Sequence, residues 1–293
     1  RVLEFSNNDM VEAAHNISRR QPGRQSILFA YGVEVVPSRT ATLPPADHTN
    51  CYLLGDPNGE FIIIDPAVRY REDMESLADA VERHNGTPIA IAYTHSHSDH
   101  LADMDLLTEA FDLPVWASDY TAKSVKCDRI LQDGEKLQLG NQEWQVLITP
   151  GHHPGHTCFF GEAGLIAGDM LAGFGTILIP PATGDMDEYI HQLARLRDLQ
   201  PHLAFPSHGP VIALPENKFN HYIKHRSARH EKVLEAVSEG LSVLSEIAIK
   251  AYEDTPNAHP GLAKDQTLAH LISHQRQGKV TQDSSGNWYA SID

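Results

Sequence analysis

A run of six residues, His95-Ser-His97-Ser-Asp99-His100, follows directly on the apolar stretch 89–94. Imidazole nitrogen and carboxylate oxygen are ligands that zinc binds at neutral pH. Four such groups this close together cannot share one face of a helix, where neighbours on a face are three or four residues apart. In a loop that follows a buried strand they can converge. We therefore predict a metal-binding loop at a strand end, rather than a solvated loop that is His-rich by chance.

Further candidate ligands lie downstream, each in a turn after a predicted strand. The Pro- and Gly-containing turn 149–156 carries three histidines, Asp169 follows the apolar residues 165–167, and His208 lies in a turn framed by Pro and Gly. Each of these is common in turns, but loops at the ends of several strands can assemble a metal centre on a rigid sheet. One histidine of the turn would bring the set to seven, which suits two metals roughly 3.5–4 Å apart that share a carboxylate.

The order of predicted elements indicates an α/β fold with a second, smaller domain. We predict strands at 27–36, 50–54, 61–66 and 89–94, with a helix at 72–84, and this order is an α/β pattern. From about residue 221 the pattern changes to helices at 228–240, 242–252 and 262–277, and then a hairpin signal at 283–286. Three helices and a hairpin resemble a winged helix. We therefore expect a catalytic domain at 1–225 and a winged-helix-like domain at 226–293.

Composition limits the partners and the compartment. The chain of 293 residues has a net charge of −16, which argues against nucleic acid and anionic membranes as partners. It contains no run of about 18 apolar residues, so we predict no transmembrane helix. Three widely spaced cysteines without a CxxC pair fit a reducing compartment, and we expect the cytoplasm. Because the first residue is Arg1 and not Met, we expect the native start to lie upstream.

The ordered set His-x-His-x-Asp-His, Pro-Gly-His, Gly-Asp and Ser-His-Gly resembles the metallo-β-lactamase superfamily over about residues 28–215. The resemblance implies an αβ/βα four-layer sandwich with two metals at one edge. It also implies which side chains bind them. The first zinc would be held by His95, His97 and His152, and the second by Asp99, His100 and His208, with Asp169 bridging both.

The stretches 168–186 and 206–210 are most similar to the lactamase-B2-like branch, which carries a C-terminal winged-helix module. One departure is Leu101-Ala102, where many members have Gly-Gly. We interpret His153 as lying beside the metal ligands or facing solvent, and His156 as orienting the loop. Asp65 either supports the metal-site loops, as in the family, or caps the turn at Pro66.

The resemblance implies a dinuclear zinc-dependent hydrolase in which a metal-bridging hydroxide attacks the substrate. We expect a small acyl substrate, namely a thioester, ester or lactone. A phosphodiester substrate remains an open alternative. Asp99 would orient the hydroxide or carry its proton. Two Zn²⁺ ions are expected, with other divalent metals as the alternative; His97 favours zinc, because the related di-iron branch tends to have Glu there. A true β-lactamase is not expected, because those zinc enzymes generally have Cys or Ser at the position of Asp169.

Two other functions stay open. Some lactamase-B2-like relatives are endoribonucleases, but residues 226–293 hold seven basic and nine acidic side chains, and a phosphate-reading helix should be richer in Lys and Arg. We therefore expect this module to cap the active-site mouth or to form a homodimer contact. The remaining alternative is a non-catalytic protein that binds a metal or ligand.

Overall fold

The structure is a computed structural model that describes residues 26–291. These residues form two compact units, each described here by itself. The first contains the residues up to Thr149 together with 155–175 and 201–215. The second contains 150–154, 176–200 and the residues from Glu216 onward.

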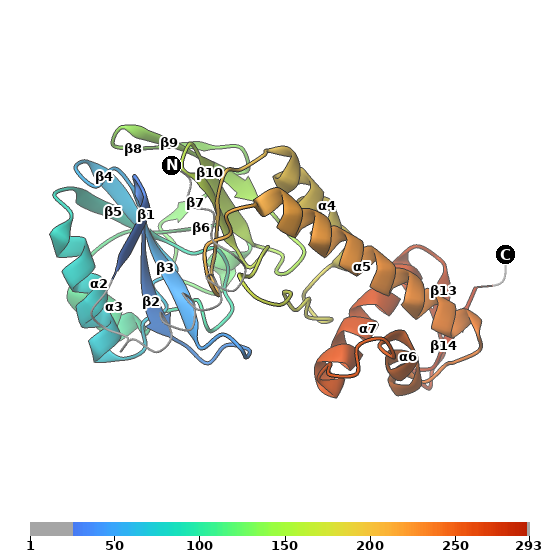
Figure 1. The fold of residues 1–293 in the computed structure, drawn as a ribbon. Coiled ribbons are helices and arrows are strands. Elements are labelled where there is room, and N and C mark those ends of the chain that lie inside the picture. Colours follow the sequence, from blue (N-terminus) through green and yellow to red (C-terminus); the bar gives the residue numbers. More distant parts are fainter. Residues whose placement is uncertain (1–25, 292–293) are drawn as a thin grey trace. The chain divides into compact units, whose positions relative to one another are not determined.

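The first unit is built on a seven-stranded sheet whose strands follow in chain order from β1 to β7 (Figure 1). The strands are β1 Ile27–Ala30, β2 Val33–Arg39, β3 His48–Gly55, β4 Glu60–Ile64, β5 Thr87–Ala92, β6 Val115–Ala117 and β7 Arg129–Ile130. Strands β1 to β4 pair antiparallel, and β4 to β7 pair parallel. The predicted single strand at 27–36 is wrong, because Gly32 adopts a φ of 82° and turns the chain back between β1 and β2.

A second, five-stranded sheet packs face to face with the first. Its order is β12-β11-β10-β9-β8. The strands are β8 Lys136–Leu139, β9 Gln142–Ile148, β10 Thr157–Gly161, β11 Gly164–Gly168 and β12 Ala204–Pro206. One buried cluster joins the two sheets and includes Ile62 and Ile64 from the first and Val146, Phe159 and Ile166 from the second. Apolar side chains on both inner faces therefore hold the sheets together.

Two helices cover the other face of the seven-stranded sheet, α2 Arg71–Arg83 and α3 Met104–Ala110 (Figure 1). Phe61 and Ile63 of β4 pack in one cluster with Leu77 of α2 and Leu107 of α3. Strand β4 is therefore buried on both faces, which explains why its sequence is continuously apolar. The predicted α/β class is confirmed for this unit.

The second unit is mainly helical. It contains α4 Met186–Asp198, α5 Pro215–Ser238, α6 Leu244–Ala251, α7 Pro260–Arg276 and the antiparallel pair β13 Val280–Gln282 and β14 Trp288–Ala290. Val237, Ile247, Leu271 and Trp288 share one buried cluster, so the hairpin packs on the last three helices. Helix α5 runs through residue 225, where we predict the domain boundary. In the described part of the chain, no helix is long and apolar enough to cross a membrane.

Candidate metal centre

Asp65 ties together the two ends of the His-rich loop. It lies directly after β4, and its buried carboxylate accepts hydrogen bonds from Thr94 N at 2.7 Å and Thr94 Oγ1 at 2.5 Å. The same carboxylate lies 2.9 Å from His100 Nδ1. These contacts support the loop that carries the candidate ligands, which is the first of the two roles expected for Asp65.

Two histidines and two carboxylates converge at the end of this loop. His100 Nε2 lies 3.6 Å from Asp169 Oδ2, and His208 Nε2 lies 3.5 Å from Asp169 Oδ1. The carboxylate of Asp99 lies 3.5 Å from His208 Nε2 and 4.0 Å from His100 Nε2. These distances exceed ordinary hydrogen-bond lengths. Two ligand atoms that each lie about 2.1 Å from one tetrahedral zinc are about 3.4 Å apart, so the spacing fits a shared cation.

The hydrogen-bond partners of His100 and His208 leave their Nε2 atoms facing this point. His208 Nδ1 lies 3.0 Å from the carbonyl oxygen of His48, and a carbonyl only accepts, so Nδ1 carries the proton. The carboxylate of Asp65 likewise accepts a hydrogen bond from Nδ1 of His100. When both rings are neutral, Nε2 holds the lone pair, and both Nε2 atoms are buried without a hydrogen-bond partner. A lone pair directed at carboxylates is stabilised by a cation between them.

The charge balance of the group favours a cation as well. Burial by itself disfavours the charged form of His100, but the negative charges of Asp169 and Asp65 outweigh it and raise the pKa of His100 well above its ordinary value. The two carboxylates therefore attract positive charge to His100 more strongly than desolvation opposes it. A divalent cation would supply that charge, so the residues present fit a metal ion.

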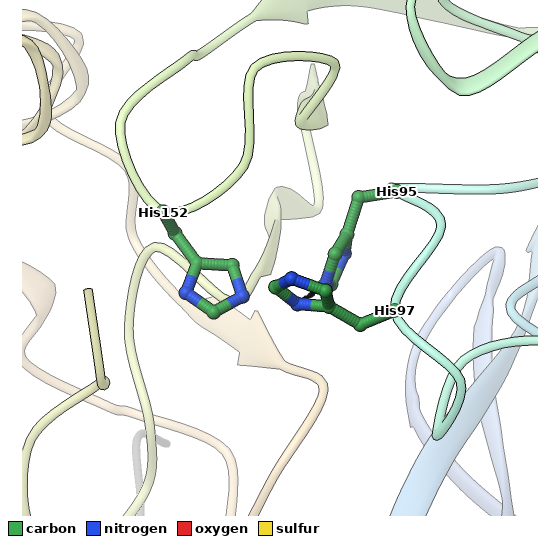
Figure 2. A group of neighbouring side chains, drawn as sticks. All are labelled: His95, His97 and His152. Carbon is green, nitrogen blue, oxygen red and sulfur yellow. Dashed lines mark hydrogen bonds between the residues drawn. The ribbon is translucent and has the colours of Figure 1, made fainter. Parts of the chain in front are cut away.

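A second group brings together three imidazoles. Ligand atoms of His95, His97 and His152 lie within 4.8 Å of one another, and Figure 2 shows the three rings facing a common point. His95 Nε2 lies 2.9 Å from His97 Nδ1, while His95 Nδ1 lies 3.0 Å from the hydroxyl of Thr94. A third group joins His95 with His100 and Asp169. All seven sequence-predicted ligands therefore occur in these overlapping groups.

The other two histidines of the turn after β9 have different positions. His156 accepts a hydrogen bond from Asp169 N at 2.9 Å, and its Nδ1 lies 2.8 Å from the hydroxyl of Thr149. Both ring nitrogens are thus engaged, and His156 orients Asp169. His153 occurs in no candidate metal group of the described residues. Because it is only 5% exposed, the solvent-facing position, one of the two expected, is wrong.

Asp169 depends on the glycine before it. Gly168 has a φ of 53°, in the left-handed region that favours glycine. A Cβ added there would lie 2.4 Å from His156 Nε2, the atom that accepts from Asp169 N. The Gly168-Asp169 pair is therefore a structural requirement of the site.

Strand β3 holds two of the ligand loops, which sequence reasoning missed. Thr49 Oγ1 donates to the carbonyl of Asp99 at 2.7 Å. Asn50 Nδ2 donates to the carbonyls of Pro206 and Gly209, both at 2.9 Å, on either side of His208. The signal in the sequence is the polar pair Thr49-Asn50 directly before the apolar residues 51–54 of the strand.

Comparison with known proteins agrees with this geometry. A family model described as the metallo-beta-lactamase superfamily matches residues 44–208. The "Beta-lactamase-like protein 2 homolog" of Drosophila melanogaster is 28% identical over 257 residues, which cover 82% of this chain and 86% of that protein. The protein of the same name from Caenorhabditis elegans is 26% identical and covers 71% of this chain and 72% of its own length.

Solved structures show the same fold. A beta-lactamase domain protein from Burkholderia ambifaria has a TM-score of 0.80 at 20% identity, covering 95% of this chain and 98% of that one. A metallo-beta-lactamase family protein from Thermus thermophilus has a TM-score of 0.71 at 21% identity, covering 89% and 99%. The predicted fold class is therefore confirmed as the metallo-β-lactamase fold. This chain belongs to the metallo-beta-lactamase superfamily, whose members are generally metal-dependent hydrolases.

Proposed function

We propose that this protein is a dinuclear zinc-dependent hydrolase of small acyl substrates, namely thioesters, esters or lactones. The observation that carries the proposal is the spacing of 3.5–4.0 Å between the Nε2 atoms of two buried histidines and the carboxylates of Asp99 and Asp169. When bound, two zinc ions lower the pKa of water to about 7 and polarise a carbonyl oxygen.

The ligands divide into two sets in this proposal. His95, His97 and His152 hold the first metal, and Asp99, His100 and His208 hold the second. Asp169 bridges them, which is supported by its position in a group with both His95 and His100. The donor set contains imidazoles and carboxylates without a thiolate, which suits zinc and also leaves other divalent metals as alternatives.

Asp99 is the proposed catalytic residue. Its backbone carbonyl is fixed by Thr49, while its carboxylate is 18% exposed, more than the 8% of Asp169. Asp99 is thus the carboxylate of the group most open to water. Asp99 would help to hold the metal, and its carboxylate can hold or pass a proton.

The charges of the C-terminal segment support a small substrate over RNA. Five of the seven basic side chains in residues 226–293 are buried or paired with an acid: Arg226, Arg229, Lys232, Lys250 and Arg276. Few cations then remain to bind a phosphate backbone. The burial and pairing of these cations therefore agree with the net negative charge of the segment, which also disfavours RNA as the substrate.

We also propose that residues 226–293 form a winged-helix-like domain that contributes a homodimer contact. The order of helices and hairpin supports the first part. A cytoplasmic location is proposed from the free cysteines, of which Cys51 and Cys158 are buried.

The test combines metal analysis with a substrate panel. We expect two equivalents of zinc by mass spectrometry and chelator-sensitive hydrolysis of at least one thioester, ester or lactone. A labelled single-stranded RNA is included as the competing substrate. RNA cleavage that is lost in His95→Ala, with an inactive acyl panel, would replace the proposal with a ribonuclease, and inactivity on every substrate would favour a binding protein.

A further inference from the structure

The imidazole of His152 is oriented by a backbone carbonyl. Its Nδ1 lies 2.7 Å from the carbonyl oxygen of Leu178, and the side chain is 4% exposed. Because a carbonyl only accepts, Nδ1 carries the proton and Nε2 keeps its lone pair. The direction of that lone pair therefore depends on where the Leu178 carbonyl is held.

Leu178 lies in an irregular segment, without the backbone ladder of a helix or strand to fix its carbonyl. Two side chains of the second unit hold the residues on either side of it. Gln266 of α7 donates through Nε2 to Ile179 O at 2.9 Å and accepts from Ile179 N at 3.2 Å. Arg226 of α5 donates to Ile177 O. The segment is thus bound before and after the carbonyl that orients His152.

The two holding side chains are joined to each other and are buried. Arg226 donates to Gln266 Oε1 at 2.7 Å, and the two residues are 2% and 7% exposed. Among the described residues, Arg226 forms no ion pair with a carboxylate; its acceptors are an amide and a carbonyl. Burying a guanidinium that has only neutral acceptors lowers the stability of the fold relative to an apolar side chain at the same place. Stability alone is therefore a poor explanation for its presence.

We propose that Gln266 and Arg226 are positioning residues for a metal ligand. By fixing residues 177–179, they hold the Leu178 carbonyl where it selects the Nδ1–H tautomer of His152 and so presents the Nε2 lone pair to a metal. The inference rests on the proposed function, in which His152 binds the first metal. It gives helices α5 and α7 a part in orienting the ring of His152.

The test compares Gln266→Leu with Gln192→Leu. Gln192 is also buried in the second unit, but its amide contacts Glu188 and Arg195 of its own helix α4. Zinc affinity is measured by competition with a chelator. We expect Gln266→Leu to weaken one of the two metal sites about tenfold, the lower end of what loss of an orienting contact costs, and Gln192→Leu to leave both unchanged.

A second readout follows the tautomer itself. Nitrogen NMR of metal-free, ¹⁵N-histidine-labelled protein should show His152 in the Nδ1–H form, and a mixture of tautomers in Gln266→Leu. Gln266→Glu keeps the acceptor for Arg226, so it should show more of the Nδ1–H form than Gln266→Leu and less than the wild type. If Gln266→Leu does not fold, Gln266→Glu is compared with the wild type instead. An unchanged tautomer and unchanged zinc affinity would overturn the inference. Wild-type protein that binds fewer than two metals would instead contradict the proposed function.

Discussion

His100 Nδ1 lies 2.9 Å from Asp65 Oδ2, and both side chains are at most 1% exposed. The two residues follow β5 and β4, which are adjacent parallel strands. The contact therefore links the ends of two strands and turns the opposite nitrogen of the ring toward Asp169 and Asp99.

Asp65→Asn should weaken binding of the second metal by about 10–100-fold. The amide cannot replace the carboxylate, because Thr94 N, Thr94 Oγ1 and His100 all contact its two oxygens. Zinc competition with a chelator measures the change. Asp56→Asn is the control, since Asp56 is also buried but bonds Tyr31 and Asn58. Equal affinity in the two variants would argue against an orienting role for Asp65.

Asp169→Ala should reduce the metal content from two per chain to one or fewer and abolish hydrolysis. The physical reason is the loss of the carboxylate whose oxygens lie 3.5–3.6 Å from His100 and His208. Circular dichroism should show that the fold is retained. A metal content that stays at two per chain would contradict the bridging role.

The adjacent histidines 152 and 153 provide a matched pair. His152→Ala should remove one metal, whereas His153→Ala should keep both, because only His152 occurs in a candidate metal group. The two side chains are similarly buried, so a general effect on packing should be comparable. Mass spectrometry of the metal-loaded variants decides between them, and the reverse pattern would show that His153 is the ligand.

Asn50→Leu should weaken the second metal site and destabilise the protein by about 1–3 kcal/mol. The side chain amide donates to the carbonyls of Pro206 and Gly209, which would be left without that donor. Denaturant unfolding gives the stability, and zinc competition gives the affinity. If stability falls while zinc affinity does not change, Asn50 supports the fold without positioning His208.

The second unit should lose stability in mild acid. Burial, together with the neighbouring His274 and Lys279 and against the opposing effect of Asp187, lowers the pKa of His230 from 6.5 to about 4. His270 Nδ1 also lies 3.1 Å from His230 Nδ1. Between these pH values the unfolded chain binds a proton that the folded unit does not, so stability falls as the pH drops from about 6.5 toward 4.

Thermal unfolding between pH 7 and pH 4 measures this effect. His230→Gln should reduce the dependence of the melting temperature on pH, because it removes one of the histidines of this unit whose pKa is lowered; His225, His270 and His274 keep theirs. An equally steep dependence in the variant would assign the acid sensitivity to other groups.

Some elements were predictable because their local chemistry is unambiguous. The continuous apolar run of β4 indicates a strand buried on both faces, and it is one. The start of helix α5 was harder to predict from the sequence, since the helix begins at Pro215 and the predicted helix begins at 228. Its early turns are rich in His, Lys and Arg, and their pattern does not reveal that Arg226 is buried against residues distant in the chain.

The kinds and the order of the ligand residues are readable from the chain, because residue type dictates which atoms can bind a cation. The direction of each ring is a different matter. It depends on acceptors that folding brings from remote segments: Asp65 for His100, the carbonyl of His48 for His208, and the carbonyl of Leu178 for His152. A backbone carbonyl is present at every residue and leaves no mark in the sequence, so the choice of tautomer becomes visible once the chain is folded.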